Sequence, residues 1–205
     1  MTFMLRRLRL SIFIVLFALP PSIAQATSPN EFIEEAVGLL EVQLDGRRED
    51  LANDKEALYA LIDEILLPRF DRRFAAGQVL ARHWRTASDE QRDRFVEAFY
   101  TTLLHRYAEG LLEFSNVGVE ILPFRGDETK KLATVKTFVR LEDGTKVPVN
   151  YTLVSRDDGW RMFDVTIEGV SYVRNFRAEF DAEIRATSLE QVIVRLEEEA
   201  VGDDG

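Results

Sequence analysis

Asp164 is the acidic residue whose surroundings most suggest chemistry. It lies between Phe163 and Val165, in a stretch rich in aromatic and branched side chains. An acid buried in such a setting has a raised pKa and can act as a general base. Alternatively, it is a structural acid that forms a salt bridge or a helix cap on the polar face of a strand, which also carries Trp160 and Met162. The residues around Asp164 favour this second interpretation.

The two histidines, His83 and His105, give no sign of a metal or cofactor. They lie on different predicted helices, each among arginines, and the chain has no cysteine. Because the sequence has neither cysteine ligands nor an H-x-x-x-H spacing, we expect no metal site. It also has no G-x-S-x-G, P-loop or Rossmann glycine pattern. We therefore expect no cofactor and interpret both histidines as surface residues.

A stripe of large apolar residues recurs at every fourth position between residues 88 and 114, which predicts one long amphipathic helix. Ser88 and Gln91 form a capping box at its start. Periodicity alone favours a plain core, and the alternative is the wall of a ligand cavity. The stripe consists of Phe95, Phe99, Leu103, Tyr107 and Leu111.

Three tyrosines suit the edge of such a cavity, because a tyrosine is apolar along its ring and polar at its tip. Tyr107, Tyr151 and Tyr172 could each place a hydroxyl at a cavity mouth, or could lie at the edge of an ordinary core.

Five arginines gather around one predicted helix of an otherwise acidic chain. They form either a solvated face, which is the simpler interpretation, or a docking patch for acidic partners or lipid headgroups. They are Arg69, Arg72, Arg73, Arg82 and Arg85.

The stretch from 159 to 177 is the element around which the others must be arranged. It predicts a strand that passes through Gly169 into a helix capped by Ser171. Because side chains alternate along a strand, one face is expected to carry Arg161, Phe163, Val165 and Ile167, and the other Trp160, Met162, Asp164, Thr166 and Glu168. The helix carries Tyr172, Phe176 and Phe180 at i, i+4 spacing. We expect the two apolar faces to turn toward each other, with the rest of the chain closing around a space between them.

The first half of the chain predicts helices, each with a capping signal. Ser28 opens a helix to about 44, Asn53 with Glu56 opens one that stops before Pro68, and Asp71 opens one that reaches Trp84. A last helix is capped by Ser188 and carries apolar residues to 196. The acidic residues 197–205 are expected to be loose.

After residue 115 the apolar period changes to two, which predicts strands. Strands are expected near 119–123, 133–141, 147–153 and from 159 onward, with turns at Asp143-Gly144 and Asp158-Gly159. Pro148 is expected near the start of its strand or at a bulge. The fold class is therefore α+β, a four-stranded curled antiparallel sheet covered by helices.

The N-terminus predicts a signal peptide over residues 1–26. Arg6, Arg7 and Arg9 precede an apolar run at 10–19, and Ala24-Gln25-Ala26 predicts cleavage after Ala26. The run is too short to span a bilayer. We divide the rest into a mainly helical part at 27–115, the sheet with C-terminal helices at 116–198 as one compact unit with it, and an acidic tail at 199–205.

Charge and cysteine content narrow the compartment and the partners. Cleavage removes three arginines and no acid, so the formal charge changes from -10 to -13. Such an acidic chain is not expected to bind nucleic acid. An exported chain without disulfides must rely on its core, which favours a bacterial periplasm.

Several runs together resemble the MlaC (toluene-tolerance auxiliary) family. They are the run from His83 to Phe95 (HWRTAS, then Gln91-Arg92 and Phe95), the run from Tyr107 to Leu112, Trp160 with Asp164-Val165 and 168–171 (EGVS), and Asn175-Phe176-Arg177. The resemblance covers about residues 28–197. It implies a nuclear-transport-factor-like sheet with an N-terminal helical subdomain, and a periplasmic phospholipid-binding protein without catalytic activity. Its implied partners are phospholipid, an outer-membrane lipoprotein complex and an inner-membrane ABC transporter with an MCE-domain ring.

On this interpretation an apolar pocket encloses acyl chains, and the protein acts as a monomer. The residues expected to line it are Phe95, Phe99, Leu103, Tyr107, Leu111, Val135, Val139, Val149, Tyr151, Phe163, Val165 and Ile167, with Tyr172 and Phe176 near the mouth. Three alternatives stay open: a carrier of hopanoid-type lipids, a nuclear-transport-factor-like enzyme using Asp164, and an assembly partner with a filled core.

Overall fold

The structure is a computed structural model that describes residues 27–114, 118–141 and 143–202, without the side chains of Leu111, Glu113 and Phe114. The predicted signal peptide at 1–26 and its cleavage after Ala26 lie outside the described residues. The helices in the first half are α1 (Pro29–Leu44), α2 (Arg48–Asn53), α3 (Lys55–Leu66), the 3-10 turn η1 (Leu67–Arg69), α4 (Arg72–Leu80), α5 (Arg82–Thr86) and α6 (Asp89–Phe114). The second half holds β1 (Val119–Ile121), β2 (Leu132–Arg140), β3 (Lys146–Arg156), β4 (Gly159–Ile167), β5 (Val170–Ser171), α7 (Tyr172–Ala186) and α8 (Leu189–Gly202).

Most helices begin at the predicted caps. The side-chain oxygens of Ser28, Asp71, Ser88 and Ser188 each accept a hydrogen bond from a backbone N–H of the first turn that follows. These bonds satisfy donors that a helix start otherwise leaves unpaired. The prediction for Asn53 is off by one residue. Asp54 accepts the bond from the Ala57 N–H.

The helix expected from Asp71 to Trp84 is broken in two. Ala81 has a φ of 49°, in the left-handed region, so α4 ends at Leu80 and α5 begins at Arg82. The break turns α5 back so that the ring of Trp84 lies against Gly77, where a Cβ atom would be 3.5 Å from the ring. A local apolar period does not reveal such a break.

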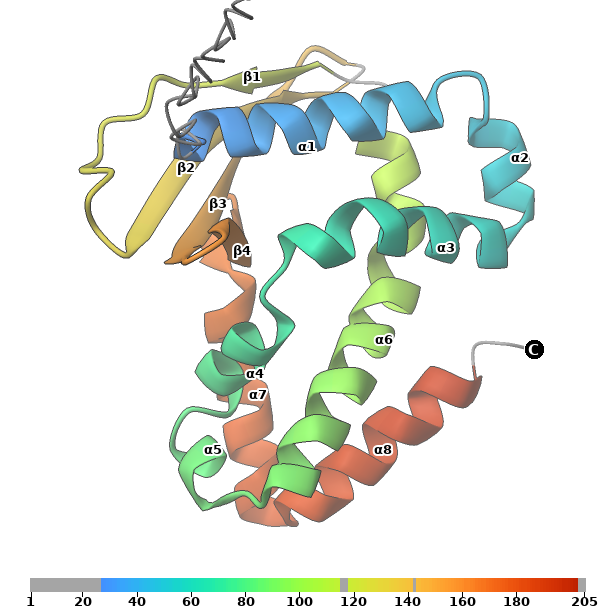
Figure 1. Ribbon diagram of the computed structural model, residues 1–205. Coiled ribbons are helices and arrows are strands. Elements are labelled where there is room, and N and C mark those ends of the chain that lie inside the picture. The colour runs from blue at the N-terminus through green and yellow to red at the C-terminus, as the bar shows by residue number, and fades with distance from the viewer. Residues whose placement is uncertain (1–26, 115–117, 142, 203–205) are drawn as a thin grey trace, which may run out of the picture.

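The sheet is antiparallel throughout, with strand order β1-β2-β3-β4-β5 (Figure 1). The four predicted strands are β1 to β4, and the two-residue β5 makes the count five. β5 forms because Glu168 and Gly169, with φ values of 50° and 85°, turn the chain back onto the end of β4. Pro148 is the third residue of β3, near the strand's start as expected.

A β-bulge in β4 changes the predicted faces. Leu153 pairs with Met162 but Thr152 pairs with Asp164, so Phe163 is an extra residue without a partner on β3. A bulge shifts the alternation by one residue. The prediction that Trp160, Met162 and Asp164 share one polar face is therefore wrong. Trp160 and Met162 join the apolar side and pack with α1.

Helix α1 lies across the sheet (Figure 1). Its Phe32 and Ile33 are buried against Val135, Leu153 and Trp160 of β2, β3 and β4. The N-terminal helix is thus part of the sheet's cover, although it is far from the sheet in sequence. Figure 1 also shows α6 running from α5 at the bottom up past α3 toward α1, with α8 along its lower half.

The largest solid core lies where α4, α6, α7 and α8 meet. Phe95 and Phe99 of α6 pack with Phe176 and Phe180 of α7, and α8 covers them with Val192, Ile193 and Leu196. The prediction of a loose tail from residue 197 onward is wrong for residues 197–202. α8 continues to Gly202. Arg94 of α6 donates to Glu197 at 2.7 and 2.8 Å, and Arg195 pairs with Glu199 at 2.6 Å. Residues 203–205 lie outside the described chain. None of the described helices is both long and apolar enough to cross a bilayer.

Candidate functional site

An apolar cavity of about 310 Å³ lies between α3, α6, α7 and β4. Part of its wall also comes from the connection between α3 and α4. Its size falls at the lower end of the range for small-molecule sites. The residues that line it are Ile62, Leu66, Phe70, Ala75, Phe99, Tyr100, Leu103, Leu104, Tyr107, Ala108, Gly110, Met162, Phe163, Asp164, Val165, Ile167, Tyr172, Val173 and Phe176.

Helix α6 supplies one long wall. Tyr100, Leu103, Tyr107 and Gly110 follow one another at spacings of three and four residues, which places them on one face of a helix. Gly110 adds no side chain, and a Cβ atom built on it would meet nothing within 4 Å. The wall therefore has an open patch one turn beyond Tyr107.

Strand β4 supplies the facing wall. Met162, Val165 and Ile167 all border the cavity, which the bulge at Phe163 makes possible because it returns Met162 to the side that carries Val165. The ring of Phe163 packs edge-to-face on Phe74 of α4, with centroids 4.9 Å apart. β4 thus combines a cavity wall with an anchor to α4.

The floor of the cavity is aromatic. The rings of Phe99 and Phe176 meet edge-to-face at 5.1 Å, and both border the cavity. Behind them, Phe95 and Phe180 complete the solid core, with ring centroids 5.6 Å apart. The hollow therefore ends where this cluster of four rings begins.

Among the described residues that line the cavity, Asp164 is the one charged residue, and both of its oxygens are used in helix capping. Oδ2 accepts from the Ser171 hydroxyl at 2.6 Å, and Oδ1 accepts from the Val173 N–H at 3.0 Å. Ser171 in turn accepts from the Arg174 N–H at 3.2 Å. These hydrogen bonds confirm the interpretation of Asp164 as a helix cap. A negative charge at this position also stabilises the N-terminus of α7.

Tyr100 connects two walls of the cavity. Its hydroxyl donates to Asp63 Oδ1 on α3 at 2.5 Å, and the Arg72 guanidinium lies 4.9 Å from the centre of its ring. Burial, followed by the hydrogen bond to Asp63, raises the pKa of the Tyr100 hydroxyl well above its ordinary value. The hydroxyl therefore stays protonated and keeps donating even near pH 10, where an ordinary tyrosine begins to ionise.

Tyr107 is 39% exposed, which is more than any other described residue that lines the cavity. We therefore place the opening of the cavity beside Tyr107. Its ring contacts that of Tyr172 across the space between α6 and α7, with centroids 5.5 Å apart and planes at 76°. Burial, followed by the nearness of Tyr107, raises the pKa of the Tyr172 hydroxyl.

Eight of the fourteen residues predicted to line a pocket lie around this cavity. They are Phe99, Leu103, Tyr107, Phe163, Val165, Ile167, Tyr172 and Phe176. Whether they contact a lipid stays a prediction. Leu111 belongs to α6, but its side chain lies outside the described part of the chain.

The other five lie elsewhere. Phe95 is fully buried in the solid core. Val135 is covered by α1, which occupies the part of the sheet that we expected to face the cavity. Val139, Val149 and Tyr151 pack together toward the other end of the sheet, and Tyr151 also reaches the cluster under α1. Only β4 of the sheet borders the cavity.

Sequence reasoning missed the wall made by α3 and the connection that follows it. The sequence predicted a helix that stops before Pro68, but no pattern in it indicated that Ile62, Leu66 and Phe70 line a cavity. Phe70 forms an isolated parallel bridge to Met162, and the Asp71 N–H donates to the Met162 carbonyl at 2.8 Å. These contacts link residues about ninety positions apart in the sequence, so no local pattern predicts them. Capping by Asp71 was the only available signal for where this segment ends.

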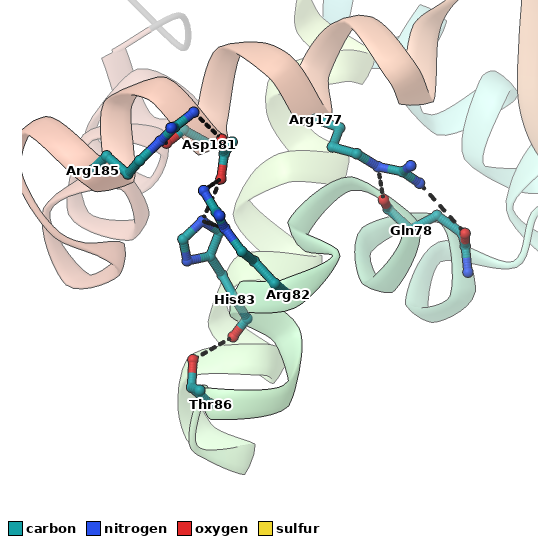
Figure 2. A network of polar contacts seen from close by, with 7 residues as sticks. All are labelled: Gln78, Arg82, His83, Thr86, Arg177, Asp181 and Arg185. Atoms are coloured by element: carbon teal, nitrogen blue, oxygen red, sulfur yellow. Dashed lines mark hydrogen bonds and ion pairs between the residues drawn. The ribbon is translucent and has the colours of Figure 1, made fainter.

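Both histidines, which the sequence predicted to lie at the surface, are half-buried there rather than fully exposed. The His83 side chain is 18% exposed, and its Nε2 lies 2.8 Å from Asp181 Oδ1 on α7. Arg82 and Arg185 also pair with Asp181 (Figure 2). His105 is half-buried and stacks on Tyr59 with centroids 4.5 Å apart. Among the described residues no group of three or more His, Cys, Asp or Glu could hold a metal ion.

Four of the five clustered arginines are paired within the chain. Arg69 donates to Glu35 at 2.9 Å and Arg72 to Glu97 at 3.0 Å. Arg73 pairs with Asp93 and Arg82 with Asp181. Figure 2 shows how the Arg82–Asp181 pair, together with the bond from Arg177 to the Gln78 carbonyl, joins α4 and α5 to α7. These pairings support the simpler interpretation, that of a solvated face of intramolecular ion pairs.

Comparison with known proteins gives consistent relatives. The chain is 28% identical over 178 residues to the toluene tolerance protein ttg2D of Pseudomonas putida, covering 86% of this chain and 82% of that protein. It is 19% identical over 177 residues to the intermembrane phospholipid transport system binding protein MlaC of Haemophilus influenzae, covering 85% and 83%.

A solved structure shares the fold. The phospholipid-binding protein of Ralstonia solanacearum, solved in complex with a phospholipid, superposes with a TM-score of 0.79 at 21% identity, covering 87% of this chain and 99% of that one. The family described as MlaC protein matches residues 37–198, which is most of the chain. The chain therefore belongs to the MlaC family.

Proposed function

We propose that this protein is a lipid carrier that encloses the acyl chains of a phospholipid in the cavity between α6 and β4. The observation that carries the proposal is an apolar hollow of about 310 Å³ whose one charged lining residue, Asp164, has both oxygens occupied. Two relatives support it: the Haemophilus influenzae protein is named for phospholipid transport, and the Ralstonia solanacearum structure contains a phospholipid.

The physics of acyl chains fits such a site. Each buried CH₂ gains about 0.8 kcal/mol, so a sixteen-carbon chain gains roughly 12 kcal/mol before the costs of ordering it. Holding the ligand therefore needs no strong contact with its headgroup. The cavity's lining offers hydrocarbon and aromatic rings, which suit an acyl chain and leave polar groups to the solvent at the mouth.

The transport role extends the same proposal. The chain is exported to the periplasm by its signal peptide and exchanges phospholipid with an outer-membrane lipoprotein complex and an inner-membrane ABC transporter carrying an MCE-domain ring. A carrier between two such complexes performs no covalent chemistry on its cargo. A hopanoid-type lipid would satisfy the same apolar walls, so the identity of the cargo is decided by what the protein retains.

The test is native mass spectrometry of the protein purified without detergent, followed by extraction and identification of its lipid. We expect a bound phospholipid at close to one molecule per chain. Val165→Trp, which fills the cavity from β4, is expected to lower this occupancy. Val139→Trp changes a buried residue of β2 that does not itself line the cavity, and it controls for general damage to the sheet. A protein that is free of lipid and takes up none from phospholipid vesicles would overturn the proposal. An extracted hopanoid would overturn the phospholipid assignment alone.

A further inference from the structure

We propose that Tyr107 and Tyr172 form a gate at the cavity mouth and that their ring contact sets the rate at which bound lipid leaves. The inference rests on the proposed function, because a release rate exists only if lipid is held. The two tyrosines come from opposite sides of the opening, Tyr107 from α6 and Tyr172 from α7. Their rings touch edge-to-face with centroids 5.5 Å apart.

The two sides of this gate are held differently. Tyr172 is the first residue of α7, directly after the capping Ser171 and directly before Val173, whose N–H is bound by Asp164. Its ring also leans on Phe176, with centroids 6.3 Å apart. Tyr107 is 39% exposed and lies on the solvent side of the contact. A rotation of the Tyr107 side chain can therefore open the mouth without moving a helix.

The strength of the contact suits a carrier. An edge-to-face aromatic pair contributes about 0.5–1.5 kcal/mol beyond its buried area. Since 1.4 kcal/mol is a factor of ten in rate, losing the pair is expected to speed release about two- to twelvefold. A barrier of this size slows accidental loss of lipid and still lets a receiving surface draw it out.

An alternative role for the same two tyrosines, binding polar atoms of the lipid through their hydroxyls, leads to a different prediction. If the hydroxyls anchor polar atoms of the lipid, removing them should matter as much as removing the rings. If the rings form the gate, Tyr107→Phe and Tyr172→Phe should release lipid at close to the wild-type rate, because phenylalanine keeps the edge-to-face contact. Alanine at either position removes ring and hydroxyl together.

The experiment loads each protein with a phosphatidylglycerol that carries a pyrene-labelled acyl chain. It then follows release into excess unlabelled phosphatidylcholine vesicles. Tyr107→Ala and Tyr172→Ala are each expected to release about two- to twelvefold faster, and the double variant no faster than the quicker single one. Tyr59→Ala, which removes a tyrosine stacked on His105 outside the cavity, is the matched control. Circular dichroism and melting confirm that each variant is folded.

The outcomes separate the gate from the carrier function. Wild-type protein that cannot be loaded would refute the proposed function. Wild-type protein that loads, with alanine variants releasing at its rate, would refute the gate alone. Acceleration in the phenylalanine variants equal to that in the alanine variants would show that the hydroxyls act, and independent, multiplying effects in the double variant would show that the two rings do not act as a pair.

Discussion

Gly110→Leu should make the protein more stable and, at the same time, a poorer lipid carrier. Gly110 is an interior residue of helix α6 and lines the cavity, and a Cβ atom built on it would meet nothing within 4 Å. Side chains on a helix lean toward its N-terminus, which here is the direction of Tyr107 and Leu103. The introduced leucine is therefore expected to lie over the cavity without displacing a neighbour.

The two effects have separate magnitudes. Glycine in a helix interior is about 0.8–1.0 kcal/mol less favourable than alanine, and leucine is close to alanine, so the free energy of unfolding should rise by about 0.5–1 kcal/mol. For a chain of this length that is about 1–4 °C in Tm. The leucine side chain has four carbons. If it displaces about four CH₂ groups of the lipid at about 0.8 kcal/mol each, the affinity falls by about 3 kcal/mol, or roughly 200-fold in Kd.

Gly38→Leu provides the matched control. Gly38 lies inside helix α1, also with nothing within 4 Å of a built Cβ, and it does not line the cavity. It should show the same gain in stability and no change in lipid binding. The assays are thermal melting of delipidated protein and titration with a fluorescent phospholipid. Wild-type affinity in a folded Gly110→Leu variant would refute the reasoning, because the lipid would then occupy some other place.

Three further results are expected. Asp164→Ala should lower the free energy of unfolding by about 1–2 kcal/mol through the lost cap of α7 and leave lipid occupancy intact; loss of lipid from the folded variant would show that its role goes beyond capping. The pKa of Tyr100 is raised in the folded protein, so the stability that it contributes is present below about pH 10 and is lost as the pH rises further. Tyr100→Phe should therefore make the free energy of unfolding depend less on pH above about pH 10. An unchanged pH dependence in this variant would contradict the reasoning. Phe95→Ala should cost about 3–5 kcal/mol in a denaturant titration, because Phe95 fills a solid core, whereas Leu103→Ala, beside an existing hollow, should cost clearly less; equal losses would indicate that the hollow is filled.

The sequence was a good guide to elements that local signals control. The capping residues Ser28, Asp71 and Ser88 mark helix starts in the structure, and the change of period after residue 115 marks the start of the sheet. Such signals act within one turn or one strand, because they depend on hydrogen bonds and side-chain directions fixed by the local backbone. The order of β2 to β5 follows from the short turns between them, whereas β1 is joined to β2 by the longer connection at 122–131.

The cavity could be predicted only in part, because a solid core and a hollow use the same residue types. Phe95 and Phe99 belong to one stripe of α6, but Phe95 is enclosed by rings while Phe99 borders the cavity. Val135 has the pattern of a cavity wall, yet α1 covers it. The bulge at Phe163 comes from the pairing of β3 with β4. Each of these depends on contacts between distant segments, which local periodicity does not encode.

The hollow persists because its surroundings are fixed independently of it. An unfilled space in a protein tends to be lost when its walls can relax inward. Here the floor belongs to the aromatic cluster that joins α6, α7 and α8, and β4 is held by its pairing with β3 and by the bond from Asp71 to the Met162 carbonyl. The wall from α3 is tied to α6 through Tyr100 and Asp63. Each wall thus has its own anchor outside the cavity, so the space between them can stay open for a ligand without weakening the fold around it.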